Sequence, residues 1–180
     1  MSTKRIAVEE AFVTQDIADG WDRVLAGKFV EPGFREMGQT ILGDGPGARL
    51  LHARLLDLGA GRIAQMDADG IDLAIVSITS PGVQVFDAVT ATRLATHAND
   101  ALADAVRANP QRLAGLAAVA PHYPTGAALE LDRAVRALGM KGFLISSHTM
   151  GEYLDDPKYW PLFEAAEALR VPMYLHPREP

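Results

Sequence analysis

The chain has 180 residues, enough to bury the core of one domain, and 48% of them are hydrophobic, as in an ordinary globular protein. Its formal net charge of −6 argues against a nucleic acid or an anionic membrane as partner. It has no cysteine, which excludes disulfide bridges and thiolate chemistry. We find neither a signal-length apolar region near the start nor the ~20 apolar residues of a membrane helix, so we expect a cytoplasmic protein.

The first predicted element is a strand over residues 5–12, in which apolar residues are followed by two acids. Side chains alternate across a strand, so Glu9 and Ala11 share one face and Glu10 lies on the other. The carboxyl ends of parallel strands form the rim where α/β proteins carry their chemistry. Glu9 is therefore the first candidate site residue.

Helical and strand patterns then alternate to the end of the chain. A helix over 50–69 would break, if anywhere, at Gly59 or Gly61, and Asp69-Gly70 is a typical helix end. The last strand ends at His176, because a proline follows. In chain order, we expect helices over 14–28, 50–69, 87–109, 125–138 and 159–170, loops over 31–47 and 147–158, and strands over 72–78, 112–119, 142–146 and 171–176.

Strands that recur with helices at a spacing of roughly 30–40 residues indicate βαβ units, and therefore a parallel sheet. The first strand is not followed by the glycine-rich loop of a dinucleotide fold. The sequence also lacks a Walker loop and a Gly-x-Ser-x-Gly elbow. These absences favour a barrel-type sheet over a doubly wound one.

Polar side chains stand at the predicted carboxyl end of each strand. They are Glu9, Thr79, Ser80, His122, Ser146, Ser147, His148, His176 and Arg178. A carboxylate and neutral imidazoles on one rim could hold a divalent metal such as zinc. From the residues alone, a single strand-end histidine is more often a hydrogen-bonded structural residue than a ligand.

Several longer stretches are distinctive: Val8-Glu-Glu-Ala-Phe12, Ser77-Ile-Thr-Ser-Pro-Gly-Val-Gln84, Ala98-Asn-Asp-Ala-Leu-Ala103, Asn109-Pro-Gln-Arg-Leu-Ala-Gly115, Ser147-His-Thr-Met-Gly-Glu-Tyr-Leu-Asp-Asp-Pro157, Trp160-Pro-Leu-Phe-Glu-Ala-Ala-Glu-Ala-Leu169 and Tyr174-Leu-His-Pro177. In them the chain resembles the decarboxylase-like branch of the amidohydrolase superfamily, the relatives of γ-resorcylate decarboxylase and aminocarboxymuconate semialdehyde decarboxylase. The resemblance covers the whole chain but only the first five strands of that family's eight-stranded barrel, which typically needs about 250 residues. It implies a single α/β domain over 1–180: a partial (β/α)8 TIM-type barrel with helices outside, open or completed by a partner chain.

The same resemblance implies that Glu9 and His176 are metal ligands, because the family carries Glu-x-His or His-x-His on strand one and a Leu-His-Pro histidine on strand five. Ala11 stands at the position of the strand-one histidine and has no ligating atom. The family's metal-binding aspartate and catalytic histidine come from strands six to eight, beyond the five matched. The implied cofactor is a divalent metal, zinc first and manganese second, with a metal-free protein as the alternative.

The implied activity is the non-oxidative decarboxylation of an aromatic or related unsaturated carboxylic acid. In the complete site a metal polarises the substrate's carboxylate or adjacent hydroxyl, an aspartate protonates the ring carbon, and carbon dioxide leaves. A hydrolase that activates water with the same metal is one alternative. Because Ala11 cannot bind a metal, the other is a metal-free relative that acts as a non-catalytic binding or structural subunit.

Arg178 and His148 are the candidate substrate-binding residues. The Arg178 guanidinium could pair with a substrate carboxylate or form a loop salt bridge, and the sequence favours neither. Hydrogen bonding within its loop suits His148 better than substrate contact. The last strand would form an exposed apolar edge, so we expect a homo-oligomer or a complementing chain, with a small-molecule carboxylate as substrate.

Overall fold

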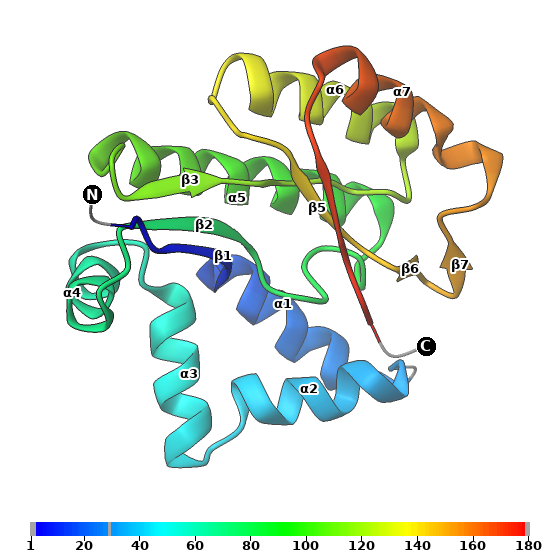
Figure 1. The fold of residues 1–180 in the computed structure, drawn as a ribbon. Coiled ribbons are helices and arrows are strands. Elements are labelled where there is room, and N and C mark those ends of the chain that lie inside the picture. Colours follow the sequence, from blue (N-terminus) through cyan, green and yellow to red (C-terminus); the bar gives the residue numbers. More distant parts are fainter. Residues whose placement is uncertain (1–2, 29, 179–180) are drawn as a thin grey trace.

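The parallel strands follow one another in chain order (Figure 1). The computed structural model describes residues 3–28 and 30–178. Its parallel strands are β1 (Ile6–Phe12), β2 (Leu73–Ile78), β3 (Leu113–Gly115), β4 (Ala117–Ala118), β5 (Phe143–Ser146) and β8 (Met173–His176). Hydrogen bonds join β1, β2 and β3 in one set and β4, β5 and β8 in the other, every pair parallel. The predicted α/β fold with a parallel sheet is confirmed.

The strand predicted over 112–119 is interrupted in the structure. β3 pairs with β2, β4 pairs with β5, and Leu116 lies between them. The Leu116 amide still donates to the carbonyl oxygen of Val76 on β2, at 2.9 Å. This one stretch of chain therefore carries the sheet from the first set of strands to the second.

Seven helices were found among the described residues, and they connect these strands. They are α1 (Gln15–Leu25), α2 (Pro32–Leu42), α3 (Pro46–Leu56), α4 (Ala60–Asp69), α5 (Ala88–Ala108), α6 (Pro124–Arg136) and α7 (Trp160–Leu169). α5, α6 and α7 lie along one face of the sheet, whereas α2 and α3 extend away from it (Figure 1). No helix in the described part of the chain is long and apolar enough to cross a membrane.

The loop predicted over 31–47 is wrong, because α2, the short connection 43–45 and the start of α3 occupy it. Pro32 and Pro46 stand in the first turns of these helices. A proline there costs no hydrogen bond, so a residue that suggested a loop in fact begins each helix. The single helix predicted over 50–69 is also wrong: it divides into α3 and α4, near the predicted glycine break, and Gly70 ends α4 with φ at 68°.

The polar loop predicted over 147–158 is wrong in part. It contains an antiparallel hairpin of β6 (His148–Thr149) and β7 (Glu152–Tyr153), followed by a 3-10 helix over Pro157–Tyr159. The side chains of His148 and Thr149 are buried although both are polar. Gln84, more than sixty residues earlier, donates to Oγ1 of Thr149 and to the backbone carbonyl oxygen of His148, and local sequence patterns do not reveal such a partner.

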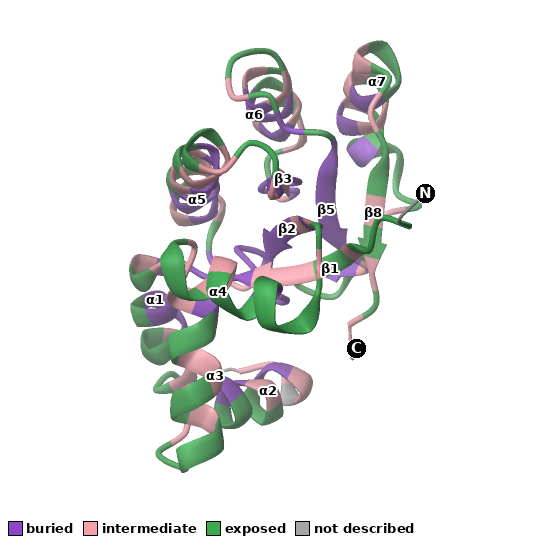
Figure 2. Ribbon diagram, turned by 60° about the vertical axis from the view of Figure 1, so that its left-hand side comes forward, coloured by how far each residue is buried: buried purple, intermediate pink, exposed green. Residues whose placement is uncertain are grey.

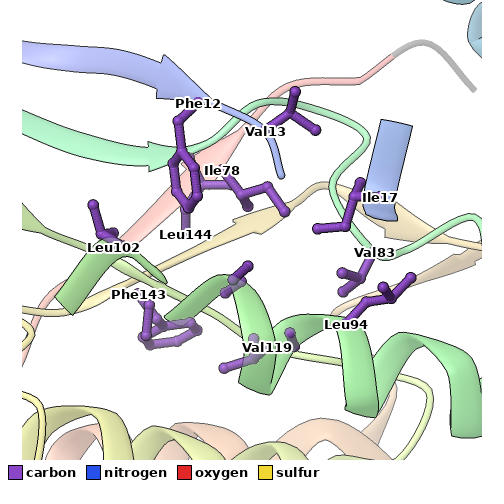
Figure 3. Close-up of a cluster of buried hydrophobic side chains, with 14 of the residues drawn as sticks. Phe12, Val13, Ile17, Ile78, Val83, Leu94, Leu102, Val119, Phe143 and Leu144 are labelled. Carbon is purple, nitrogen blue, oxygen red and sulfur yellow. The ribbon is translucent and has the colours of Figure 1, made fainter. Parts of the chain in front are cut away.

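The core lies between the sheet and its helices. Phe12, Ile78, Leu102, Phe143 and Leu144 all belong to one buried cluster (Figure 3). They come from three strands and α5, so burying them holds the strands and that helix together.

The buried side-chain amide of Asn99 adds hydrogen bonds to this core. Asn99 on α5 donates to the carbonyl oxygen of Ala118 at 2.9 Å, and its side-chain oxygen accepts from the Ala118 amide at 2.7 Å. The same side chain donates to Glu130 on α6. Asn99 therefore ties α5 to β4 and to α6.

The two outermost strands are much more exposed than the strands between them (Figure 2). Val8 on β1 is 58% exposed and Leu175 on β8 is 52% exposed. Each of these strands has one hydrogen-bonded neighbour in the described part of the chain. The predicted apolar edge at the last strand is confirmed, and β1 forms a second edge.

Candidate metal centre

Glu9 and His176 face each other although 166 residues separate them in sequence. The Oε1 atom of Glu9 lies 3.4 Å from Nε2 of His176. Glu9 is on β1 and His176 ends β8, and these strands do not pair with each other. The predicted meeting of positions 9 and 176 on one rim is confirmed as geometry; their role as metal ligands stays a prediction.

The local structure of β1 sends its two glutamates in opposite directions. Its register against β2 shifts between Ala7 and Glu10, and such bulges re-aim side chains near functional sites. Glu10 turns to α4, where its carboxylate lies 3.6 Å from the buried guanidinium of Arg62. The same guanidinium donates to the carbonyl oxygen of Ala11 at 2.6 Å. Arg62 therefore anchors the end of β1 and leaves Glu9 to the opposite side.

The ring of His176 is oriented by its own backbone neighbour. Its Nδ1 lies 2.6 Å from the carbonyl oxygen of Pro177, and a carbonyl can only accept, so Nδ1 carries the hydrogen. A neutral ring then presents the unprotonated Nε2 toward the carboxylate of Glu9. Metal-binding histidines are commonly oriented by a hydrogen bond of this kind.

Oε1 of Glu9 and the unprotonated Nε2 of His176 are both acceptors, so this contact is favourable only with a positive charge between them. Either a proton on Nε2 or a metal ion bound by both atoms supplies that charge. Two ligand atoms bonded at about 2.1 Å to one cation, with an angle of about 90–110° between the bonds, lie about 3.0–3.4 Å apart. The 3.4 Å separation of Glu9 and His176 fits this geometry.

The pair does not complete a metal site by itself. Across residues 3–28 and 30–178, no cluster of three or more histidine, cysteine, aspartate or glutamate side chains could hold a metal ion. Ala11 carries no ligating atom. Tyr174, two residues before His176, has its pKa raised above the ordinary value by hydrogen bonding to Glu9 and by burial. The pair therefore has a polar neighbour but no third ligand of those types.

Arg178 forms the salt bridge that was one of its two predicted alternatives. Its guanidinium pairs with Glu31, just before α2, and also lies 3.5 Å from the carbonyl oxygen of His148. The side chain is 4% exposed, and burial lowers its pKa to about 10, so it stays charged at neutral pH. A contact with a substrate carboxylate stays a prediction.

The histidines at two other strand ends take up packing positions. His148 is buried, with its ring centre 5.7 Å from that of Tyr153 and its Nδ1 3.4 Å from Oγ of Ser147. Neither ring nitrogen of His122 has a hydrogen-bond partner, and burial lowers the pKa of this ring. Substrate binding by His148 stays a prediction.

The sequence did not identify Gln84 as a site residue, although Gln84 ends the distinctive stretch Ser77–Gln84. Its side chain is buried, and its Nε2 donates to Oγ1 of Thr149 at 2.6 Å and to the carbonyl oxygen of His148 at 3.0 Å. A signal was present, because Gln84 is a lone amide inside the apolar run Val83-Gln84-Val85-Phe86. Where the polar residue of such a run is buried, it must find hydrogen-bond partners.

Three comparisons with known proteins bear on this site. The family model described as amidohydrolase matches residues 51–179. The γ-resorcylate decarboxylase of Polaromonas sp. (strain JS666 / ATCC BAA-500) is 41% identical over 137 residues, which is 72% of this chain and 42% of that protein. A solved 5-carboxyvanillate decarboxylase of Novosphingobium aromaticivorans, with bound manganese and 3-methoxy-4-hydroxy-5-nitrobenzoic acid, superposes with a TM-score of 0.96 at 44% identity.

A solved 2,6-dihydroxybenzoate decarboxylase of Rhizobium superposes with a TM-score of 0.82 at 31% identity. The two superpositions cover 98% and 99% of this chain but 51% of each of the larger proteins. The chain thus spans about half the length of the solved relatives. This share agrees with the predicted partial barrel.

Proposed function

This chain belongs to the amidohydrolase family, and we propose that it supplies two metal ligands of a non-oxidative decarboxylase of aromatic carboxylic acids. The observation that carries the proposal is the pairing of Glu9 with the oriented ring of His176 across 3.4 Å. The relatives described above supply the class of reaction, because they are decarboxylases of hydroxylated benzoates or of related acids. Among the described residues, no further histidine, cysteine, aspartate or glutamate side chain joins this pair, so any other ligand is of another type, such as water.

In the proposed site, Oε1 of Glu9 and Nε2 of His176 hold a divalent cation. The cation would act as a Lewis acid on the substrate's carboxylate or its adjacent hydroxyl. The hydrogen bond from Nδ1 to Pro177 keeps the His176 ring in the tautomer that leaves Nε2 free. The negative charge of Glu9 offsets part of the cation's charge and favours a cation over an anion between the two side chains.

We propose manganese as the first metal to test and zinc as the second. Manganese is the metal bound in the solved 5-carboxyvanillate decarboxylase. One carboxylate and one imidazole suit either ion, so the described ligands do not select between them. For the substrate we propose a benzoate with a neighbouring hydroxyl group, such as 5-carboxyvanillate, since its decarboxylase shares 44% identity over nearly the whole chain.

One observation favours the metal-free alternative. Ala11 offers no second ligand from β1, and no third ligand of the usual types joins the pair among the described residues. Under that alternative the Glu9–His176 contact is an ion pair with protonated histidine, and the chain is a non-catalytic subunit.

The test is the affinity of the purified chain for Mn²⁺ and for Zn²⁺, measured by isothermal titration calorimetry. We expect Glu9→Gln and His176→Ala to weaken binding by about 100-fold or more, since each removes a proposed ligand outright. Glu10→Gln is the matched control, because it removes a neighbouring carboxylate that faces Arg62, and it should leave the affinity within about twofold.

Absence of binding of either metal to the native chain would overturn the metal site and support the non-catalytic subunit. Release of carbon dioxide from 5-carboxyvanillate is a separate measurement of the substrate class. Metal binding without release from any hydroxybenzoate would overturn the proposed reaction for this chain while leaving its metal site intact.

A further inference from the structure

β1 and β8 carry the two proposed ligands, yet no hydrogen bond of the sheet joins these strands. Their relative position is therefore set indirectly, through the strands between them and through contacts at the strand ends. The loop between β2 and α5, residues 79–87, contacts the end of β1 and, through Gln84, the end of β5, which pairs with β8. It is bonded to the end of β1, because the Thr79 amide donates to the carbonyl oxygen of Phe12 at 2.8 Å.

A second bond fixes the same loop from another direction. Nε1 of the buried Trp21, on α1, donates to the carbonyl oxygen of Gly82 at 2.9 Å. A hydrogen bond within the loop also closes it, since the backbone N–H of Gln84 donates to the carbonyl oxygen of Pro81 at 3.1 Å. These bonds make it a firm support on the β1 side of the site.

From this support, Gln84 reaches the end of β5. Its side-chain oxygen accepts from the Ser146 amide at 2.7 Å, and its Nε2 lies 3.3 Å from the carbonyl oxygen of the same residue. Further bonds from Nε2 reach His148 and Thr149 in the hairpin. The buried amide therefore uses both of its ends to hold the chain at residues 146–149.

The end of β5 in turn holds His176. Ser146 and His176 are partners in the parallel register, and the Ser147 amide donates to the carbonyl oxygen of His176 at 2.9 Å. A continuous series of hydrogen bonds thus runs from Phe12, three residues after Glu9, through Gln84 to His176. The strand ladders form a second path from β1 to β8, through β2, residues 113–118 and β5, and the Gln84 series supplements that path at the carboxyl ends of the strands.

We propose that Gln84 is a positioning residue that sets the separation of Glu9 and His176, and with it the geometry of the metal site. It touches neither ligand and acts through the end of β5. The metal part of this inference rests on the proposed function; the positional part rests on the hydrogen bonds alone.

The test compares two buried side-chain amides in the 180-residue chain. Gln84→Met keeps the shape of the side chain and removes its hydrogen bonds. Asn99→Leu does the same for the amide that ties α5 to β4, away from the β5–β8 end. Hydrogen exchange of individual amides, followed by NMR, is measured beside the affinity for Mn²⁺.

For Gln84→Met we expect exchange of the Ser147 amide to rise at least tenfold and Mn²⁺ binding to weaken by about 10–100-fold, the range for residues that orient a ligand. For Asn99→Leu we expect faster exchange at Ala118 with unchanged Mn²⁺ affinity. If Gln84→Met does not fold, Thr149→Val replaces it, because this change removes only one acceptor of Gln84 and should shift both measurements in the same direction by less.

Equal effects of the two amide changes at Ser147 and on Mn²⁺ would overturn the proposal, since Gln84 would then contribute only to overall stability. Unchanged exchange at Ser147 in Gln84→Met would also overturn it. If the native chain binds no Mn²⁺, the proposed function fails, and the exchange measurement alone decides whether Gln84 positions His176.

Discussion

β5 and β8 are neighbouring strands of equal length, paired residue by residue, but their surroundings differ. All four residues of β5 are buried, whereas those of β8 alternate between exposed and half-buried (Figure 2). β5 lies between β4 and β8, while β8 has a strand on one side only in the described part of the chain. The proposed ligand His176 is thus on the less supported strand. Stability and proposed site are thus separated, because the central strand is buried in the core and the two edge strands carry the proposed ligands.

This separation explains why a side chain as distant as Gln84 matters. An edge strand with one neighbour inherits its position from that neighbour. Any residue that holds the end of β5 therefore also holds His176. The predictions that follow test this difference between centre and edge.

The largest effect is expected in the central strand. Phe143→Ala on β5 removes a ring that is 0% exposed and leaves a cavity, so the free energy of unfolding should fall by about 3–5 kcal/mol. Leu175→Ala on β8 is the edge counterpart and should cost less than about 1 kcal/mol. Urea unfolding followed by circular dichroism measures both. Similar losses for the two would contradict the distinction between the strands.

The next effect concerns the segment just after β8. Glu31→Gln leaves the buried guanidinium of Arg178 without its partner carboxylate. Because Glu31 is itself partly exposed, we expect a loss of about 1–3 kcal/mol rather than the full cost of an orphaned buried charge. Asp132→Asn breaks the exposed pair with Arg136 and should cost at most about 0.5 kcal/mol. Equal costs in urea unfolding would show that Arg178 is not held by Glu31.

A smaller, pH-dependent effect is expected at His122, after β4. Burial lowers the pKa of His122 below its ordinary value of 6.5, although the nearby backbone of Gln84 and Phe86 and the charges of Asp87 and Glu152 oppose this. The unfolded chain then takes up a proton at a higher pH than the folded chain does. The contribution to stability is complete above pH 6.5 and is lost as the pH falls below it.

The measurement is urea unfolding of the native chain and of His122→Asn between pH 5 and 8. The stability of the native chain should fall more steeply on acidification than that of the variant. Parallel curves would mean that His122 ionises equally in both states.

Substitutions on the exposed edge strands β1 and β8 should have the smallest effect on stability. They should nevertheless change the self-association of the chain. We predict that the chain self-associates through β1 or β8, whose apolar side chains Val8 and Leu175 face solvent. Leu175→Lys should change the free energy of unfolding by no more than about 0.5 kcal/mol and should reduce association. Val89→Lys, at an even more exposed apolar position on α5, is the control. Multi-angle light scattering over a range of concentrations decides, and a native chain that stays monomeric throughout would refute the prediction.

Most helices and strands were predictable from the sequence, because the residues that specify them lie close together in the chain. The apolar run of β2, the stripe of α5 and the stop at Gly70 each depend on residues close together in the chain. The same reasoning failed at α2 and at the β6–β7 hairpin. At α2 a proline begins a helix rather than a loop, and the hairpin is held by Gln84, more than sixty residues before it.

The sequence by itself determined the α/β class, the resemblance to a family, and the candidates Glu9 and His176, since residue type and order are enough for these. Only the tertiary structure decided that the two side chains lie 3.4 Å apart, that Arg178 pairs with Glu31, and that Gln84 links the two sides of the site. The physical reason is distance along the chain. A register shift in β1, a ring tautomer chosen by Pro177 and a buried amide's partners all depend on which segments meet, and that is settled by the packing of the whole sheet.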